Sequence, residues 1–170
     1  GSPVDLGKFF SEQEERGFII NQVSFIGHST LRRELGSGDP LSSASAGQIE
    51  IMEGQVREAL AAGACGISLG LAYIPGSSEE GIYRLSQIVA DADKLIAGDT
   101  RLKTPDDLDS LREVVEISRR TGARTQVSHF VYQYGTGGLT EALAIIDEAR
   151  AEGIDIRLDS GMYTPWTSGI

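Results

Sequence analysis

The chain has 170 residues, with 40% hydrophobic and 24% charged residues and a formal net charge of −10. These values are typical of one globular domain with a packed core and argue against disorder. The acidic balance argues against binding to nucleic acids or anionic membranes, because both need clustered Lys and Arg. The basic pairs Arg32-Arg33 and Arg119-Arg120 are separate and form no patch.

The single cysteine and the lack of long apolar stretches bear on location. Cys65 alone cannot form an internal disulfide, which fits a reducing compartment. No apolar stretch approaches the roughly 18 residues that a membrane helix needs, and no signal peptide is recognisable. We therefore expect a soluble, cytoplasmic protein in which Cys65 fills core space rather than acting as a reactive thiol.

From the middle of the chain onward, one pattern recurs: an amphipathic helix, a glycine and a short apolar strand. The glycines Gly63, Gly122 and Gly153 follow helical patterns, at the position where a left-handed residue ends a helix. Ser45 and Gln48 have the spacing of a capping box at a helix start. Thr104 before Pro105 predicts another helix start.

Apolar residues at helical spacing form four stripes: Ile49, Met52, Val56 and Leu60; Ile82, Leu85 and Val89; Leu108, Leu111 and Val115; and Leu139, Leu143 and Ile146. Five strands are predicted between and around them, at 23–26, 65–71, 94–97, 124–130 and 154–158. Strands that alternate with helices predict right-handed βαβ units and a parallel α/β sheet.

Such units form either an open doubly wound sheet or a (β/α)8 barrel. No G-x-G-x-x-G segment follows a strand, so a dinucleotide site is not expected. Five units are too few to close an eight-stranded barrel by themselves.

In parallel α/β proteins, functional residues gather where the strands end. Both histidines of the chain, His28 and His129, lie at predicted strand ends. His129 is either a metal or substrate ligand or a histidine hydrogen-bonded within the packed strand end. His28 is more typical of a loop residue that bonds neighbouring backbone.

Other polar residues at strand ends have equally simple structural interpretations. Asp99 and Arg101 could form a surface ion pair. Asp159 could cap the turn that follows it, and Tyr73 could be a half-buried turn residue.

Two stretches, SFIGHSTLRR (24–33) and REALAAGACGISLGLAYIPGS (57–77), resemble the N-acyl-D-amino-acid deacylases of the amidohydrolase superfamily. VSHF (127–130) and DSGMYT (159–164) lie where that family has further strand ends. The resemblance runs from about residue 18 to the end of the chain. It implies a middle fragment of a zinc-dependent (β/α)8 barrel in which a metal-activated water attacks an amide carbonyl.

Carried over residue by residue, the resemblance makes His129 a zinc ligand and aligns Asp99 with a second family histidine. Asp99 can bind a metal through oxygen but favours harder ions. Val131 stands where the family has a lysine that grips the substrate carboxylate, which puts substrate recognition in doubt. The candidate substrate-binding residues are Tyr73, Arg101, Tyr163 and His28. The family's H-x-H pair, a ligating cysteine and a carboxylate base have no counterpart here, so no catalytic residue is assigned.

Three functions remain open for this stretch of chain. It is part of a metal-dependent hydrolase of N-acyl-D-amino acids or related small amides, a non-catalytic relative that binds ligands, or a purely structural half-barrel. An open half-barrel would leave strand edges and barrel-facing side chains uncovered, which predicts self-association or marginal stability.

Overall fold

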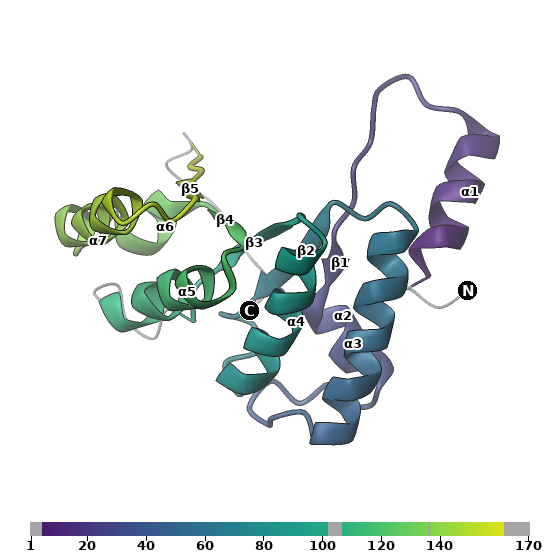
Figure 1. The fold of residues 1–170 in the computed structure, drawn as a ribbon, viewed down its shortest axis with the longest axis horizontal. Helices are drawn as coiled ribbons and strands as arrows, with labels where there is room; N and C mark the ends of the chain where they lie inside the picture. Colours follow the sequence, from purple (N-terminus) through teal and green to yellow (C-terminus); the bar gives the residue numbers. More distant parts are fainter. Residues whose placement is uncertain (1–4, 102–106, 136, 162–170) are drawn as a thin grey trace.

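The computed structural model describes residues 5–101, 107–135 and 137–161 and contains a five-stranded parallel β-sheet (Figure 1). Its strands are β1 (Ile26–Gly27), β2 (Gly66–Gly70), β3 (Leu95–Asp99), β4 (Arg124–Val127) and β5 (Ile156–Leu158). They lie in the sheet in their order along the chain. A doubly wound sheet reverses its strand order at a switch point, whereas a barrel keeps it sequential. The structure is therefore an arc of the barrel type.

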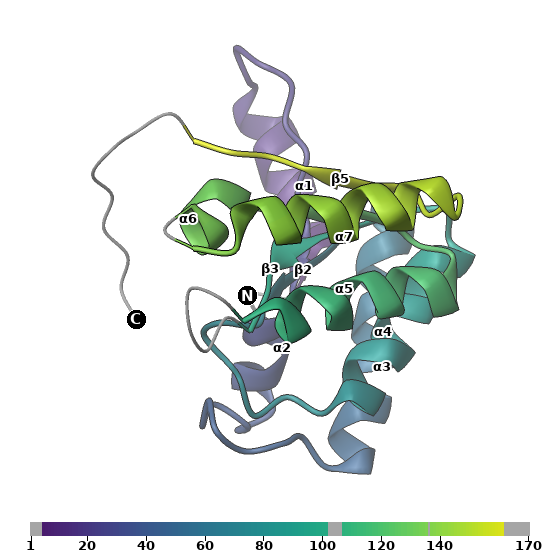
Figure 2. The same ribbon diagram turned by 90° about the vertical axis from the view of Figure 1, so that its left-hand side faces the viewer.

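Four of the helices form an outer layer over one face of this arc. The helices are α1 (Leu6–Arg16), α2 (His28–Glu34), α3 (Ala46–Ala61), α4 (Glu79–Asp91), α5 (Leu108–Thr121), α6 (Phe130–Tyr134) and α7 (Leu139–Ala151). Helices α3, α4, α5 and α7 pack side by side in that order, and α5 and α7 lie next to each other in Figure 2. None of the helices, within the part of the chain described, is long and apolar enough to cross a membrane.

Most of the predicted helix signals are confirmed. Ser45 and Gln48 form the capping box at the start of α3. Gly63, Gly122 and Gly153 all have positive φ. At α5, however, the cap is Asp107, whose carboxylate accepts the backbone N–H and the hydroxyl of Ser110 at 3.2 and 2.7 Å. The prediction of Thr104 as the cap is therefore wrong, and Thr104 and Pro105 themselves lie outside the described residues.

The pairing of the strands shows which residues lie on each face of the sheet. One row across the five strands packs beneath the helices and is at most 4% exposed: Ile26, Ile67, Ile96, Thr125 and Ile156. The adjacent row is small or polar: Gly27, Ser68, Ala97, Gln126 and Arg157. Since side chains alternate along a strand, this second row lies on the face without helices. That face holds a groove of about 530 Å³, which reaches Ser128 and Asp159.

The predicted bounds of four strands and one helix face need correction, and β5 begins at Ile156 rather than at 154. Strand β1 begins only at Ile26, because Val23 is exposed and belongs to a segment without a paired strand. Strand β3 continues to Asp99. Strand β4 stops at Val127, and Phe130 already begins α6. In α7 the predicted stripe residue Ile146 is buried, but Leu143 is 40% exposed, because the buried face of the helix runs through Ala142, Ile146 and Ala149. Helix α1 was not predicted; its Phe10 ring packs against Gly63.

Close contact between β2 and β3 depends on Gly98. A Cβ atom added at Gly98 would lie 2.2 Å from the carbonyl oxygen of Leu69. Only glycine lets the two backbones approach this closely, and Gly98 immediately precedes Asp99 at the end of β3. The position of Asp99 therefore depends on this contact.

We expect Gly98→Ala to lower the free energy of unfolding by about 1–3 kcal/mol, because the added methyl group forces β2 and β3 apart. Urea titration followed by circular dichroism would measure the change. The matched control is Gly54→Ala in α3, where nothing lies within 4 Å of the added Cβ. Alanine is the better helix former, so this control should gain about 0.5–1 kcal/mol. Equal effects at both positions would contradict the packing explanation.

Candidate metal centre

Four polar residues lie together where β3, β4 and β5 end. Gly98 pairs with Val127, and Val127 pairs with Leu158, so the residues after them end at the same edge of the sheet. These residues are Asp99, Ser128-His129 and Asp159. The two predicted metal ligands thereby lie at the ends of adjacent strands, and the His129 imidazole partly offsets the rise that burial causes in the pKa of the Asp99 carboxyl.

Asp99 is a buried carboxylate, with 6% of its surface exposed. Burial raises the pKa of this carboxyl, and the backbone N–H of Ala72, 3.4 Å from Oδ1, partly offsets that effect. A carboxylate removed from water is stabilised when a cation lies beside it. Asp99 is therefore suited to bind a positively charged ligand.

His129 is exposed and adopts the left-handed conformation, with φ 40° and ψ 45°. Histidine enters this region more readily than most residues, but the conformation still costs about 1 kcal/mol. It places His129 in the turn between β4 and α6, immediately beyond the last strand residues.

Asp159 holds this turn from the neighbouring strand. Its Oδ1 accepts the backbone N–H of His129 at 2.5 Å, and its Oδ2 accepts the side-chain N–H of Gln126 at 3.1 Å. Its backbone carbonyl accepts the N–H of Phe130 at 2.8 Å. Asp159 thus caps the turn that contains His129, whereas the turn after Asp159 continues outside the described residues, so the prediction that Asp159 caps it stays a prediction.

The chemistry of this donor set fits a divalent metal, but only in part. An imidazole nitrogen and a carboxylate oxygen are both ligands that zinc accepts. Among the described residues no group of three His, Cys, Asp or Glu side chains could hold a metal. His129 and Asp99 therefore supply two ligands, and a four-coordinate site would need others from outside this cluster.

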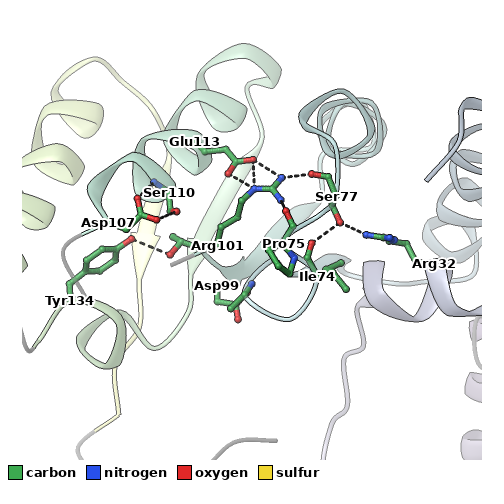
Figure 3. Close-up of polar contacts among 12 residues, drawn as sticks. Arg32, Ile74, Pro75, Ser77, Asp99, Arg101, Asp107, Ser110, Glu113 and Tyr134 are labelled. Carbon is green, nitrogen blue, oxygen red and sulfur yellow. Dashed lines mark hydrogen bonds and ion pairs between the residues drawn. The ribbon is translucent and has the colours of Figure 1, made fainter. Parts of the chain in front are cut away.

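Arg101 has a structural set of partners. Its guanidinium forms a bidentate ion pair with Glu113 of α5, with a shortest N–O distance of 2.7 Å, and donates to the carbonyls of Pro75 and Ser77 (Figure 3). Figure 3 shows the Asp99 carboxylate pointing away from this guanidinium, so the suggested Asp99–Arg101 ion pair is wrong. A substrate-binding role for Arg101 stays a prediction, and most of its N–H groups are already engaged.

A second arginine anchors the same loop, which joins β2 to α4. Arg32 is 1% exposed, and it donates to the Ser77 hydroxyl at 2.6 Å and to the carbonyls of Asp39 and Ser42. The Ser77 hydroxyl in turn donates to the Ile74 carbonyl at 3.0 Å. We did not predict this anchor from the sequence, where Arg32 looked like one of a pair at a helix end. Its position four residues after His28 on one helical face was the available signal.

His28 is the first residue of α2 and is 3% exposed, so the prediction of a loop residue is wrong. Its Nδ1 has no hydrogen-bond partner among the described residues. Burial, together with the nearby charges of Arg32 and Arg101, lowers the pKa of His28 to about 4. The imidazole is therefore neutral at physiological pH, and a substrate-binding role for it stays a prediction.

The structure says less about the remaining residues that the sequence singled out. Tyr73 lies in the turn after β2 and is 43% exposed, as expected for a half-buried turn residue. Tyr163 lies outside the described residues. Burial raises the pKa of the Cys65 thiol, which fits a space-filling role rather than a reactive one. Behind the site, the buried Tyr134 hydroxyl lies 3.1 Å from that of Thr100 and ties α6 to the end of β3.

Removing the loop anchor should destabilise the fold. We expect Arg101→Ala to lower the free energy of unfolding by about 3–5 kcal/mol, because it leaves the Glu113 carboxylate mostly buried without its partner. The matched control is Arg112→Ala on α5, whose ion pair with Asp109 is exposed and should contribute less than about 1 kcal/mol. Chemical denaturation measures the stability of both variants. A small loss of unfolding free energy in Arg101→Ala would contradict the role of Arg101 as a structural anchor.

Burial of His28 should make stability depend on pH. The pKa of His28 in the folded chain, about 4, lies below its ordinary value of 6.5, so the unfolded chain binds the proton first as the pH falls. The free energy of unfolding should therefore be unaffected above about pH 6.5 and fall by about 3 kcal/mol between there and about pH 4. In His28→Gln this part of the loss should disappear, as measured by denaturation across that pH range. Parallel curves for the two proteins would contradict the burial of a neutral imidazole.

Comparisons with known proteins show which proteins this chain resembles. No protein-family model matches the chain. It is 34% identical over 164 residues to N-acyl-D-glutamate deacylase of Alcaligenes xylosoxydans xylosoxydans, covering 94% of this chain and 33% of that protein. It superposes with a TM-score of 0.80 on N-acyl-D-glutamate deacylase from Bordetella bronchiseptica, solved with zinc and a phosphonate inhibitor, at 29% identity over 94% of this chain and 34% of that one.

D-aminoacylase matches with a TM-score of 0.74 and 30% identity, over 85% of this chain and 31% of that protein. The chain thus spans about one third of the length of the relatives it matches. The sequence resemblance and the parallel arc of strands both point to the same group of proteins. The chain is homologous to a segment of the catalytic barrel of the N-acyl-D-amino-acid deacylases, within the amidohydrolases.

Proposed function

We propose that this chain is a single partial (β/α) barrel domain of a metal-dependent amidohydrolase that hydrolyses N-acyl-D-amino acids or related small amides. The observation that carries the proposal is the meeting of Asp99 and His129 at the ends of adjacent strands, in a segment homologous to deacylases. The relatives named above act on N-acyl-D-glutamate or D-amino acid derivatives. Residues beyond this segment would have to complete the barrel.

His129 and Asp99 would hold the metal, and it would polarise the amide carbonyl and activate a water when bound. The buried Asp99 would supply a negative charge close to the imidazole of His129. The arginine-anchored loop between β2 and α4 would fix Tyr73 at the rim of the site. Tyr163, Arg101 and His28 stay candidates for substrate contact.

A second candidate function is ligand binding without turnover. Two departures from the family pattern favour it: Asp99 in place of a histidine, and Val131 in place of the lysine that grips the substrate carboxylate. This function would be supported if a protein that contains this segment and the rest of the barrel bound an acyl amino acid without hydrolysing it.

Location and association are also proposals. The single cysteine supports a cytoplasmic protein. An open arc has two edge strands, β1 and β5, through which it could self-associate, although their lengths of two and three residues limit pairing. The helix-free row of the sheet is small and polar, which makes association through that face weaker than an apolar face would allow.

The decisive test is metal binding by the purified chain. Mass spectrometry measures how much zinc and manganese the chain binds, and calorimetry measures the affinities. Both metals should bind, and His129→Ala should weaken their binding at least about tenfold. Asp99→His should shift preference from manganese toward zinc, because it replaces a hard oxygen ligand with a nitrogen.

Asp109→His, at an exposed position of α5, is the matched control and should change neither the zinc nor the manganese affinity. Metal content that is unaffected by His129→Ala would overturn the assignment of the site. Hydrolysis of acyl-D-amino acids by a protein that contains this segment and the rest of the barrel separates the enzymatic proposal from the binding one.

A further inference from the structure

The Asp159 carboxylate has a role that the metal-ligand pair alone does not explain. It is exposed and forms no ion pair among the described residues, yet both of its oxygens accept hydrogen bonds from β4 and the turn that follows. The bond to the His129 backbone N–H, at 2.5 Å, is the shorter one. A carboxylate that accepts a backbone N–H forms a charge-assisted hydrogen bond, which is stronger than a neutral one.

His129 needs such a contact because of its backbone conformation. At φ 40° it is one of two non-glycine residues with positive φ in the described part of the chain. Without an external hydrogen bond, a residue there gains by relaxing toward negative φ. That change would alter the direction of the His129 side chain relative to Asp99 at the end of β3.

Neighbouring bonds hold Asp159 in place. The Gln126 side chain donates to its Oδ2, its own backbone N–H donates to the Val127 carbonyl at 3.1 Å, and its carbonyl accepts from Phe130. Asp159 therefore spans β5, the end of β4 and the start of α6. It is a rigid support for one residue of the turn.

We propose that Asp159 is a positioning residue: its carboxylate fixes the left-handed backbone of His129 and thereby aims the imidazole toward Asp99. In this role Asp159 does not bind the metal; it supplies the acceptor for the His129 N–H, and its charge only strengthens that hydrogen bond. Its influence on metal affinity rests on the proposed function, whereas its influence on the His129 backbone does not.

The test compares Asp159→Asn and Asp159→Ala with Asp155→Ala as the matched control. Asp155 lines the same groove, and its side chain pairs with Arg157 at 3.1 Å rather than with the turn. Asparagine keeps an acceptor oxygen for the His129 N–H but loses the charge, and alanine loses both.

Nuclear magnetic resonance of the metal-free chain gives the first measurement. The His129 amide proton should show the downfield shift of a bond to a carboxylate, and the strong intraresidue amide–Hα Overhauser effect that positive φ produces. Asp159→Asn should keep the Overhauser effect, Asp159→Ala should lose it, and Asp155→Ala should change neither signal. Retention of positive φ in folded Asp159→Ala would overturn the proposal.

Zinc titration of the same proteins gives the second measurement. Asp159→Ala should weaken binding about 10–100-fold, as loss of a residue that orients a ligand does. Asp159→Asn should stay within about threefold of the unsubstituted chain. Equal large losses in both variants would mean that Asp159 binds the metal directly, and this would overturn the positioning role.

If the unsubstituted chain binds no zinc, its two ligands do not suffice without the rest of the barrel, and the resonance measurement alone decides the role of Asp159. If Asp159→Ala fails to fold, the asparagine variant still decides it. A lost Overhauser effect in Asp159→Asn overturns the proposal, and a retained effect with near-normal zinc affinity supports it.

Discussion

Hydrogen bonding between β3, β4 and β5 fixes the heights at which Asp99, His129 and Asp159 leave the sheet, and the candidate site depends on that alignment. The ladder continues past the strands themselves, since Ser128 donates to Gly98 and Phe130 donates to Asp159. The close approach at Gly98 sets the position of β3 against β2. A shift of one residue in any of these pairings would turn the polar side chains toward the helices.

Two layers of support surround the strand ends. On one side, Arg32 and Arg101 fix the loop between β2 and α4 through buried hydrogen bonds and the Glu113 ion pair (Figure 3). On the other side, Asp159 and Tyr134 fix the turn and the short helix after β4. The residues that support the site thus outnumber the two that would bind a metal, as is usual where ligands must be held in a defined geometry.

The face of the sheet without helices distinguishes this arc from a packed hydrophobic core. Barrel interiors are commonly filled by branched apolar side chains, whereas the row through Ser68, Ala97, Gln126 and Arg157 is small or polar. A polar interior beneath the strand ends is compatible with water and a polar substrate nearby. It also reduces the apolar area that this open arc exposes.

The sequence by itself determined the parallel α/β class, the five strands and the helices α3, α4, α5 and α7. These follow from periodicity and turn chemistry, which act over a few residues. The proposal that His129 binds a metal came from its place at a strand end and from the family resemblance. The tertiary structure confirmed the sequential arc that the family resemblance implied, and it alone decided that His28 and Arg32 are buried and that Arg101 pairs with Glu113 rather than Asp99. It also assigned Asp159 to the turn that carries His129, 30 residues away in the chain. Such contacts depend on register and packing between distant segments, and the local pattern of the sequence does not specify the partners.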